Sequence, residues 1–218
     1  MNELPILFED GEALVIDKPA GLPLDTPRAG GASLADQIET LTLGFSRLPM
    51  PVHRLDQDTS GCLLLARNPK ALKRFAAAFE ARQVEKLYLG VVAGEVAGEA
   101  GVISLNLTKI SSKAGGWRII PAKAGKPATT GWRVLARADG LTLVAFRPET
   151  GRTHQIRVHA LHGLGAALLG DPVYGRADSR VGRTMLHAAG LTVPREGKAP
   201  IVAEAPLPAD FTALGFTI

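Results

Sequence analysis

The sequence predicts an α+β fold in which a largely antiparallel, mixed sheet is flanked by helices and loops. Short apolar runs separated by Gly, Pro, Asp and Lys dominate the chain after residue 100, a pattern typical of strands joined by hairpins. The Asp139-Gly140 pair between two of these runs is a strong hairpin signal. Two helix-like segments come earlier, and strand and helix do not alternate strictly. This pattern favours an α+β domain over a doubly wound nucleotide-binding fold.

Three strands, two of them buried, and one helix are predicted first along the chain. Continuous apolar runs over residues 13–16 and 62–66 indicate buried strands, and residues 87–92 are predicted to form a further strand. Between the first two runs, Ser33 is placed to cap a helix over residues 34–41, where apolar residues recur at helical spacing.

A second helix is predicted directly after the second of these strands. Asn68 is a favourable N-cap, and Pro69 suits the first helical position, where its missing N–H would have no intrahelical partner. Leu72, Phe75 and Phe79 then share one face, which we expect to pack on the sheet.

The second half is predicted to contain a run of strands and one short helix. The strands cover residues 102–107, 117–120, 129–136 and 141–146. The helix is expected to run from His154 to His162, with Thr153 as its cap and Gly163 at its end.

Composition places the chain among ordinary globular proteins. It has 218 residues, of which 46% are apolar and 21% are charged, and we expect a single domain over residues 1–218. The single cysteine, Cys62, excludes an intrachain disulfide framework and fits a reducing compartment such as the cytoplasm. No apolar run is long enough for a transmembrane helix, so no membrane partner is expected.

Charge is distributed unevenly along the chain. The formal net charge is +4, yet residues 1–50 hold 3 basic and 8 acidic side chains, and residues 106–160 hold 10 basic and 2 acidic ones. A basic block can bind a polyanion through release of counterions. The alternative is a solvated face of one sign, so charge alone leaves both interpretations open.

Two polar segments interrupt apolar surroundings and are candidates for a site. The first, PVHRLDQDTSG over residues 51–61, places Asp56 just before a buried strand, where a carboxylate can act as a nucleophile or a general base. The second, ETGRTHQIRVH over residues 149–159, presents Arg157 near a helix start, where it could hold a carboxylate or a phosphate. The simpler alternatives are turn-forming residues in the first segment and a surface arginine in the second.

Other chemistries find less support. His154, His159 and His162 lack the spacing of a zinc-binding helix, and no cysteine pair accompanies them, so no metal is expected. Cys62 is interpreted as a small buried residue. No phosphate-binding glycine motif occurs, so no nucleotide cofactor is expected. Tyr88 could stack on a base or could simply pack in the core.

The polar segments resemble those of a known family. HRLDQDTSG over residues 53–61 resembles the HRLDxxTSG signature of the RluA-type RNA pseudouridine synthases. GRTHQIRVH over 151–159 and GDPVY over 170–174 are similar to later motifs of that family. IDKPAGL over 16–22 and KLY over 86–88 also fit, in the family's order.

The resemblance implies a catalytic set. It makes Asp56 the catalytic aspartate, whose attack on a target uridine lets the glycosidic bond break before the uracil rejoins through C5. It implies that Arg157 pairs with Asp56 and keeps it ionised, and that Tyr88 stacks on the uracil. Arg54 would enter the space left by the flipped base, Arg152 would contact phosphate, and His53 and His154 would join the substrate-binding residues.

The resemblance also implies what accompanies the site. It implies the pseudouridine synthase catalytic fold as one domain. Many members of this family carry an S4-type RNA-binding domain ahead of the catalytic part, and we expect none here, because the family pattern begins within the first two dozen residues. It implies an RNA partner, ribosomal or transfer RNA, with no cofactor and no metal, and monomer is the default expectation. Two alternatives remain: an RNA-binding module without chemistry, and an N-glycosidase, which would need a second carboxylate, Asp58 being nearest.

Overall fold

The computed structural model describes residues 4–27, 30–112 and 116–217. The chain divides into two compact units. Unit 1 comprises Met1–Lys86 and His187–Pro206, and unit 2 comprises Leu87–Leu186 and Leu207–Ile218. Each unit has its own run of hydrogen-bonded strands, and β5 (Glu85–Ala93) and β10 (Leu186–Val193) are the strands in which the chain passes from one unit to the other.

Unit 1 contains a mixed sheet in the order β1-β2-β4-β10. Its strands are β1 (Ile6–Glu9), β2 (Ala13–Lys18), β4 (Ser60–Ala66) and β10, with β3 (Met50–Pro51) beside β4 and β11 (Ile201–Glu204) beside β10. The β4–β10 pair is parallel, whereas the other pairs of this sheet are antiparallel. Every residue of β4 is buried, as its continuous apolar run predicts.

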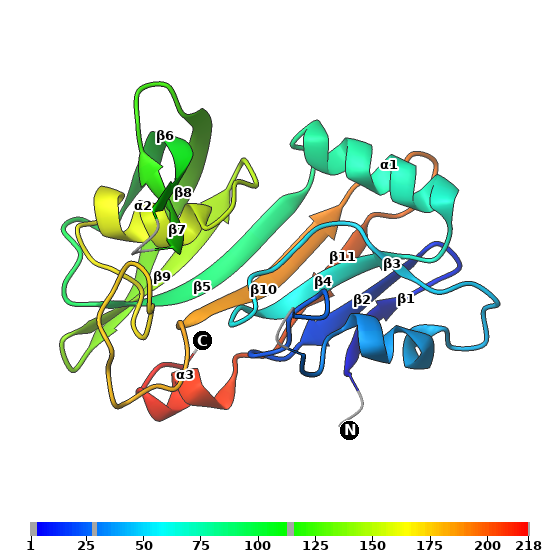
Figure 1. Ribbon diagram of the computed structural model, residues 1–218, viewed down its shortest axis with the longest axis horizontal. Helices are drawn as coiled ribbons and strands as arrows, with labels where there is room; N and C mark the ends of the chain where they lie inside the picture. Colours follow the sequence, from blue (N-terminus) through cyan, green and yellow to red (C-terminus); the bar gives the residue numbers. More distant parts are fainter. Residues whose placement is uncertain (1–3, 28–29, 113–115, 218) are drawn as a thin grey trace. The chain divides into compact units, whose positions relative to one another are not determined.

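Helix α1 (Pro69–Glu80) covers one face of this sheet (Figure 1). Its N-cap is Asn68, whose side chain accepts a hydrogen bond from the Ala71 N–H at 2.9 Å, as predicted. Phe75 is 1% exposed and packs with the strand residues Val15 and Leu64 in a hydrophobic cluster of unit 1. The apolar spacing along the helix therefore places its buried face on the sheet.

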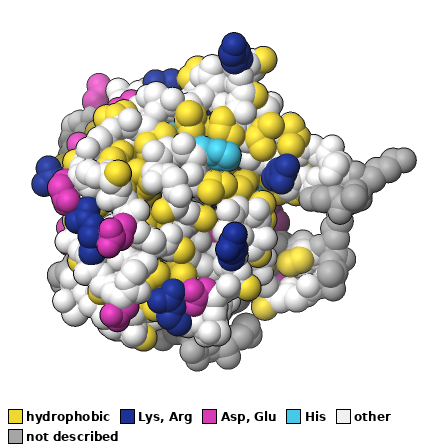
Figure 2. All heavy atoms as spheres, turned by 90° about the vertical axis from the view of Figure 1, so that its left-hand side faces the viewer, with side chains coloured by type: hydrophobic (Ala, Val, Ile, Leu, Met, Phe, Trp, Pro, Cys, Tyr) yellow, Lys and Arg dark blue, Asp and Glu magenta, His cyan; other side chains and the backbone are white. Residues whose placement is uncertain are grey.

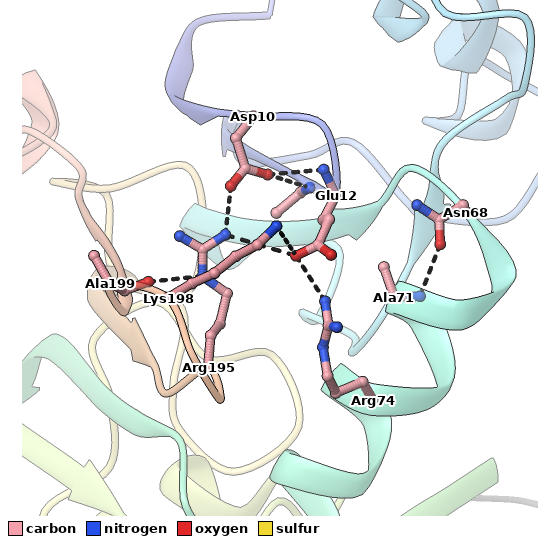
Figure 3. A network of polar contacts seen from close by, with 9 residues as sticks. Asp10, Glu12, Asn68, Ala71, Arg74, Arg195, Lys198 and Ala199 are labelled. Atoms are coloured by element: carbon pink, nitrogen blue, oxygen red, sulfur yellow. Dashed lines mark hydrogen bonds and ion pairs between the residues drawn. The ribbon is translucent and has the colours of Figure 1, made fainter.

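A network of ion pairs joins three parts of unit 1 at one end of its sheet (Figure 3). Glu12, in the β1–β2 connection, forms ion pairs with Arg74 of α1 at 2.7 Å and with Lys198 of the β10–β11 connection at 3.2 Å. Arg195 from the same connection pairs with Asp10. The Arg74 hydrogen bond is the largest influence on the pKa of Glu12 and holds it below its usual value. The network links elements that are distant in sequence.

The first predicted helix is a 3-10 helix, η1 (Ala35–Leu41). The expected Ser33 cap is one residue too early: the N-cap is Leu34, which makes no side-chain capping bond. Ser33, just before it, forms reciprocal hydrogen bonds with Asp36. The Asp36 carboxylate accepts the Ser33 N–H and hydroxyl at 2.9 and 2.7 Å, and the Ser33 hydroxyl accepts the Asp36 N–H at 3.3 Å. At seven residues, η1 is longer than most 3-10 helices, which rarely exceed about four residues.

Unit 2 is built on an antiparallel sheet in the order β5-β9-β8-β6-β7. The added strands are β6 (Ala100–Ser112), β7 (Gly116–Pro121), β8 (Lys126–Ala138) and β9 (Leu141–Pro148). The predicted turn is present, because Asp139 and Gly140 both have positive φ, 49° and 70°, and connect β8 to β9. These strands extend beyond the predicted apolar runs, because their exposed residues also pair with the neighbouring strands.

Helix α2 (Gln155–Gly163) lies beside this sheet (Figure 1), and α3 (Ala209–Ala213) is near the C-terminus. The expected Thr153 cap is wrong. The N-cap is His154, which adopts a left-handed conformation with φ 52° and makes no side-chain capping bond. The Gln155 side chain instead links the first residue of the helix to the preceding loop, by accepting the Arg152 N–H at 3.0 Å. The largely antiparallel α+β fold predicted from the sequence is confirmed.

Candidate active site

Asp56 lies in the connection between β3 and β4 of unit 1. The Thr59 N–H donates to the Asp56 carbonyl at 3.0 Å, which closes a β-turn over these four residues. Asp56 and Asp58 are half-buried, whereas Arg54 is exposed. The polar residues that the sequence offered as turn formers therefore do form a turn, and that turn presents Asp56 just before a fully buried strand.

A buried lysine holds the backbone next to Asp56. Lys18, at the end of β2, is fully buried. Its ammonium donates to three carbonyl oxygens, those of Pro19 at 2.8 Å, Leu22 at 2.9 Å and Gln57 at 2.9 Å. An ammonium has three N–H donors, and an unsatisfied buried charge would be costly. Because one of these carbonyls belongs to Gln57, Lys18 fixes the chain beside Asp56.

The end of the signature is packed against β10. The Ser60 hydroxyl lies 2.9 Å from Nδ1 of His187, and both residues are buried. Gly61 has a φ of 104°, and a Cβ added there would lie 2.2 Å from the Ala188 carbonyl oxygen. Only glycine therefore fits at this position, both for its backbone conformation and for the closeness of the neighbouring strand.

His53 has a contact of its own within unit 1. Its Nε2 accepts the Leu64 N–H at 3.0 Å, and its ring stacks on Phe79 of α1 with 4.8 Å between centroids. Burial, with a smaller contribution from the Lys86 charge, lowers the pKa of His53 to about 4. The imidazole is thus neutral at pH 7, and it connects the beginning of the signature to β4 and α1.

Arg157 lies on α2 of unit 2 and forms a buried ion pair with Asp171. Its Nε and Nη2 donate to the two carboxylate oxygens of Asp171 at 2.7 and 2.8 Å, a bidentate geometry. Arg157 is 7% exposed and Asp171 is 0% exposed. The pair uses two of the five N–H donors of the guanidinium and fixes the plane of the group. The sequence assigned no role to Asp171.

Asp171 is also held by its own turn. One of its oxygens, Oδ1, accepts the backbone N–H groups of Val173 at 2.9 Å and Tyr174 at 3.1 Å. Burial raises the pKa of this carboxyl, but the hydrogen bonds and charge of Arg157 and the two backbone N–H groups outweigh it, so the pKa is lowered. Asp171 is therefore ionised at neutral pH and gives Arg157 a rigid anchor.

Gln155 attaches the start of α2 to β8. Its amide oxygen accepts the Arg152 N–H at 3.0 Å and the Thr150 hydroxyl at 2.7 Å. Its amide nitrogen donates to the Thr129 carbonyl and the Thr130 hydroxyl, both at 3.0 Å. All four hydrogen-bonding positions of this buried amide are thus used. The helix that carries Arg157 is consequently fixed in position along the sheet.

The remaining candidates occupy different settings. Tyr88 is half-buried on β5 and packs beside the apolar cluster of unit 2. Arg152 is exposed, and its Nε donates to the Pro127 carbonyl at 3.3 Å. His154 is half-buried and bonds to Tyr174. Cys62 is buried, and burial raises the pKa of its thiol to about 12, which confirms the packing interpretation.

Neither a metal centre nor a membrane span is found among the described residues. Within them, no group of three His, Cys, Asp or Glu side chains is arranged to hold a metal ion. None of the helices in that part of the chain has the length and apolar character needed to cross a bilayer.

The structure brings forward four residues to which sequence reasoning gave no role: Lys18, Gln155, Asp171 and Tyr174. Each belongs to a segment that resembles the family, namely IDKPAGL, GRTHQIRVH or GDPVY. The only signal in the sequence was therefore that these residues belong to the segments that resemble the family. A buried lysine or aspartate requires a partner, but the sequence shows neither the burial nor the partner.

Comparison with known proteins places the chain in a family. The family model for RNA pseudouridylate synthases matches residues 12–162. An uncharacterised RNA pseudouridine synthase of Zymomonas mobilis is 54% identical over 97% of both chains. Ribosomal large subunit pseudouridine synthase D of Nitrosomonas europaea is 39% identical over 97% of this chain and 64% of the relative.

Solved structures agree with the sequence relatives. The human protein called RNA pseudouridylate synthase domain containing 1 matches with a TM-score of 0.80 and 29% identity, over 97% of this chain and 87% of that one. The fold is thus that of an RNA-modifying isomerase. The chain belongs to the RluA-type RNA pseudouridine synthases, enzymes that isomerise uridine to pseudouridine, as the motif resemblance predicted.

Replacement of Gly61 by alanine is expected to destabilise the protein by about 2 kcal/mol or more, because the new methyl group would overlap the Ala188 carbonyl. Gly21→Ala is the matched control: Gly21 also has a positive φ, 82°, but a Cβ added to it would meet no atom within 4 Å. The control should lose only about 1–2 kcal/mol from backbone strain. Urea unfolding of both variants measures the difference, and equal losses would contradict the steric account.

The free energy of unfolding is expected to fall as pH decreases from about 6.5 towards about 4. Burial lowers the pKa of His159 to about 4 from an ordinary value of 6.5, so in this window the unfolded chain binds a proton that the folded chain does not. Between pH 7 and 5 the loss from His159 is about 2 kcal/mol. In urea titrations across this range, the free energy of unfolding of His159→Gln should depend less steeply on pH than that of wild type. Equal pH dependence in the two proteins would show that His159 is not responsible for the loss.

Proposed function

We propose that the enzyme converts specific uridines of structured RNA, ribosomal or transfer RNA, to pseudouridine, with Asp56 as the catalytic carboxylate and the target base flipped out of its helix. The family establishes the reaction class. The name of the Nitrosomonas relative, a ribosomal large subunit pseudouridine synthase, supports a ribosomal substrate. The proposal treats the chain as a monomer in the cytoplasm, a reducing compartment compatible with the single buried cysteine, Cys62.

The observation that carries the proposal is that contacts on two sides hold the turn containing Asp56 in place. On one side, the buried ammonium of Lys18 holds the Gln57 carbonyl at 2.9 Å. On the other side, Gly61 packs directly against the backbone of the neighbouring strand. A turn that only connected two strands would not need a desolvated cation beside it. A carboxylate that must meet a reacting atom gains from such fixed geometry, because misplacement by about 1 Å can cost about 100-fold in rate.

The chemistry agrees with this residue set. Uridine and pseudouridine contain the same atoms, so the reaction breaks the C1′–N1 bond, forms a C1′–C5 bond, removes the C5 proton and adds a proton at N1. No net oxidation or hydrolysis occurs, and the balance requires no redox cofactor and no nucleotide triphosphate. The proposed step is attack by the Asp56 carboxylate on the uridine, which permits glycosidic cleavage while the uracil stays bound.

Arg157 and Tyr88 are proposed to complete the catalytic set. Arg157 would keep Asp56 ionised and oriented, a role that suits a guanidinium whose plane is already set by Asp171. Tyr88 would stack on the extruded uracil. Asp56 belongs to unit 1 and the other two to unit 2. The proposal is that all three act on the same nucleotide.

RNA affinity is attributed to exposed cations of unit 2. Eight basic side chains between residues 106 and 160 are exposed: Lys109, Arg118, Lys123, Lys126, Arg133, Arg137, Arg147 and Arg152. Lys113 lies outside the described residues. Figure 2 shows that on one face Lys and Arg side chains are scattered among apolar side chains, several of them beside Asp or Glu. Spaced cations suit a phosphate backbone, and their binding energy would offset the cost of base flipping.

Three further residues receive roles from the resemblance. Arg54 is exposed beside the Asp56 turn and is proposed to occupy the space that the flipped base leaves. His53 and His154 are proposed to support substrate binding. Their described contacts, with Leu64 and Tyr174 respectively, favour support through local structure.

Asp56→Asn is expected to abolish pseudouridine formation and to leave RNA affinity within about 3-fold, because the carboxylate carries the chemistry and the exposed cations carry the affinity. The substrate is total RNA from a strain that lacks the gene, and pseudouridine is measured after incubation with enzyme. Asp58→Asn, two residues away in the same turn, is the matched control and should retain at least about half of the activity. Activity in the Asp56 variant would overturn the proposal, as would equal losses in both variants.

Arg157→Lys is expected to reduce the maximal rate at least about 10-fold, because lysine cannot reproduce the bidentate contact with Asp171. Arg152→Lys should change the rate less than about 3-fold and act mainly on RNA affinity. Lysine is used because alanine would leave Asp171 buried without its described partner, at a cost of about 3–5 kcal/mol. Rates at saturating RNA measure the comparison, and a larger loss for Arg152→Lys would mean that the wrong arginine is assigned.

A further inference from the structure

A chain of aromatic contacts connects the β6–β7 hairpin to Arg157, entirely within unit 2. Trp117, on β7, stacks on the imidazole of His154 with 4.8 Å between ring centroids and 28° between planes. His154 in turn meets the edge of the Tyr174 ring at 5.6 Å. The guanidinium of Arg157 lies over the Tyr174 ring, 5.1 Å from its centroid. Four side chains from three separate segments thus form one continuous array.

Tyr174 is the centre of this array. Its hydroxyl accepts the Ile119 N–H of β7 at 2.9 Å and lies 2.9 Å from Nδ1 of His154. Its ring contacts the small core formed by Ile119 and Val158, and Val158 neighbours Arg157 on α2. The hydroxyl is therefore hydrogen-bonded to the β6–β7 hairpin, while the ring faces α2, the helix that bears Arg157.

Tyr174 influences Arg157 by two routes. The first is the ring itself, against which the guanidinium is placed. The second runs through Asp171: its Oδ1 accepts both the Tyr174 N–H, at 3.1 Å, and Nη2 of Arg157, at 2.8 Å. If Tyr174 moved, its ring beneath the Arg157 guanidinium would move, and so would the Asp171 carboxylate that binds this guanidinium.

The backbone at His154 shows that the array is held under constraint. His154 has φ 52°, a left-handed conformation that costs a non-glycine residue about 1–2 kcal/mol. Local capping does not explain it, since the side chain makes no capping hydrogen bond. The conformation directs the ring to Trp117 and Tyr174, with which it stacks and hydrogen-bonds. These contacts offset the cost.

Trp117 could instead be a platform for an RNA base, since it is 43% exposed. Its ring is already engaged, however. His154 stacks on it, and the Lys109 ammonium lies 4.6 Å from its centroid. A base would have to displace one of these contacts to stack there. The arrangement favours a support over a platform.

We propose that Tyr174 is a positioning residue for Arg157, and that Trp117 and His154 hold Tyr174 in place, so that the β6–β7 hairpin forms part of the structure that orients the catalytic arginine. The inference rests on the proposed function, in which Arg157 orients Asp56. An incorrectly oriented guanidinium would weaken an interaction that matters in the transition state and would leave RNA affinity unaffected.

The test separates maximal rate from RNA affinity. Tyr174→Phe removes the hydroxyl and keeps the ring, so the maximal rate on total RNA from the deletion strain should fall about 10-fold while KM stays within about 2-fold. Trp117→Ala should act in the same way, and Trp117→Phe, which preserves a stacking ring, should restore the rate to within about 3-fold of wild type. Val102→Ala, at a 67% exposed position of β6, is the control and should behave as wild type.

A second readout does not depend on turnover. In ¹⁵N NMR spectra, the Arg157 Nε–H should exchange slowly with solvent in the wild type, because it donates to buried Asp171, and faster in Tyr174→Phe. A thermal midpoint within a few degrees of wild type would show that Tyr174→Phe is folded.

The possible results of these experiments distinguish the positioning role of Tyr174 from an RNA contact at Trp117, and both from a failure of the proposed function. A raised KM with an unchanged maximal rate in Trp117→Ala would identify Trp117 as an RNA contact and overturn the proposal. Unchanged kinetics and exchange in Tyr174→Phe would overturn it as well. An active Asp56→Asn enzyme, in contrast, would refute the proposed function itself, so the two failures are distinguishable.

Discussion

A charge removed from water must be surrounded by groups of opposite polarity, and this constraint organises both units. In unit 1, the ammonium of Lys18 is fully buried and donates to three carbonyl oxygens. In unit 2, Arg157 is buried against the carboxylate of Asp171. Neither cation could remain there if its acceptors moved, because an isolated buried charge costs several kcal/mol. Each therefore fixes the backbone that supplies its acceptors.

The geometry of the motifs follows from these buried contacts. Lys18 reaches the carbonyl next to Asp56, which explains why a lysine in IDKPAGL matters to a turn 39 residues later. Gln155 in GRTHQIRVH secures α2 to β8 through four hydrogen bonds. Asp171 in GDPVY receives the guanidinium. Each motif thus combines a residue proposed for chemistry or binding with residues that fix its position.

Much of the fold could be predicted from local pattern. The buried strand β4, the Asn68 cap of α1 and the Asp139-Gly140 turn depend on nearest neighbours in sequence, and all three are confirmed. Strand β10 was not predicted, since its sequence LHAAGLTV is rich in Ala and Gly, which are poor strand formers. It pairs with β4 and β11, contacts that no local window contains.

The site shows the same division. Asp56, Arg157 and Tyr88 were identified because their motifs resemble a family, and their assigned roles remain predictions. The partners Asp171 and Lys18 were not identified, because burial of a charged side chain depends on tertiary packing. The left-handed His154 was likewise missed: its ring stacks on Trp117, which is 37 residues earlier in the chain. Local rules failed where distant contacts outweigh local preference.

The account depends most on the claim that Asp56 performs chemistry on uridine in RNA. A transcriptome-wide pseudouridine map of cells that lack the gene, complemented with wild type or with Asp56→Asn, tests it most directly. The account predicts that a small set of sites in ribosomal or transfer RNA disappears on deletion, returns with the wild-type gene and stays absent with the variant. An identical map in all strains, or restoration by Asp56→Asn, would contradict it.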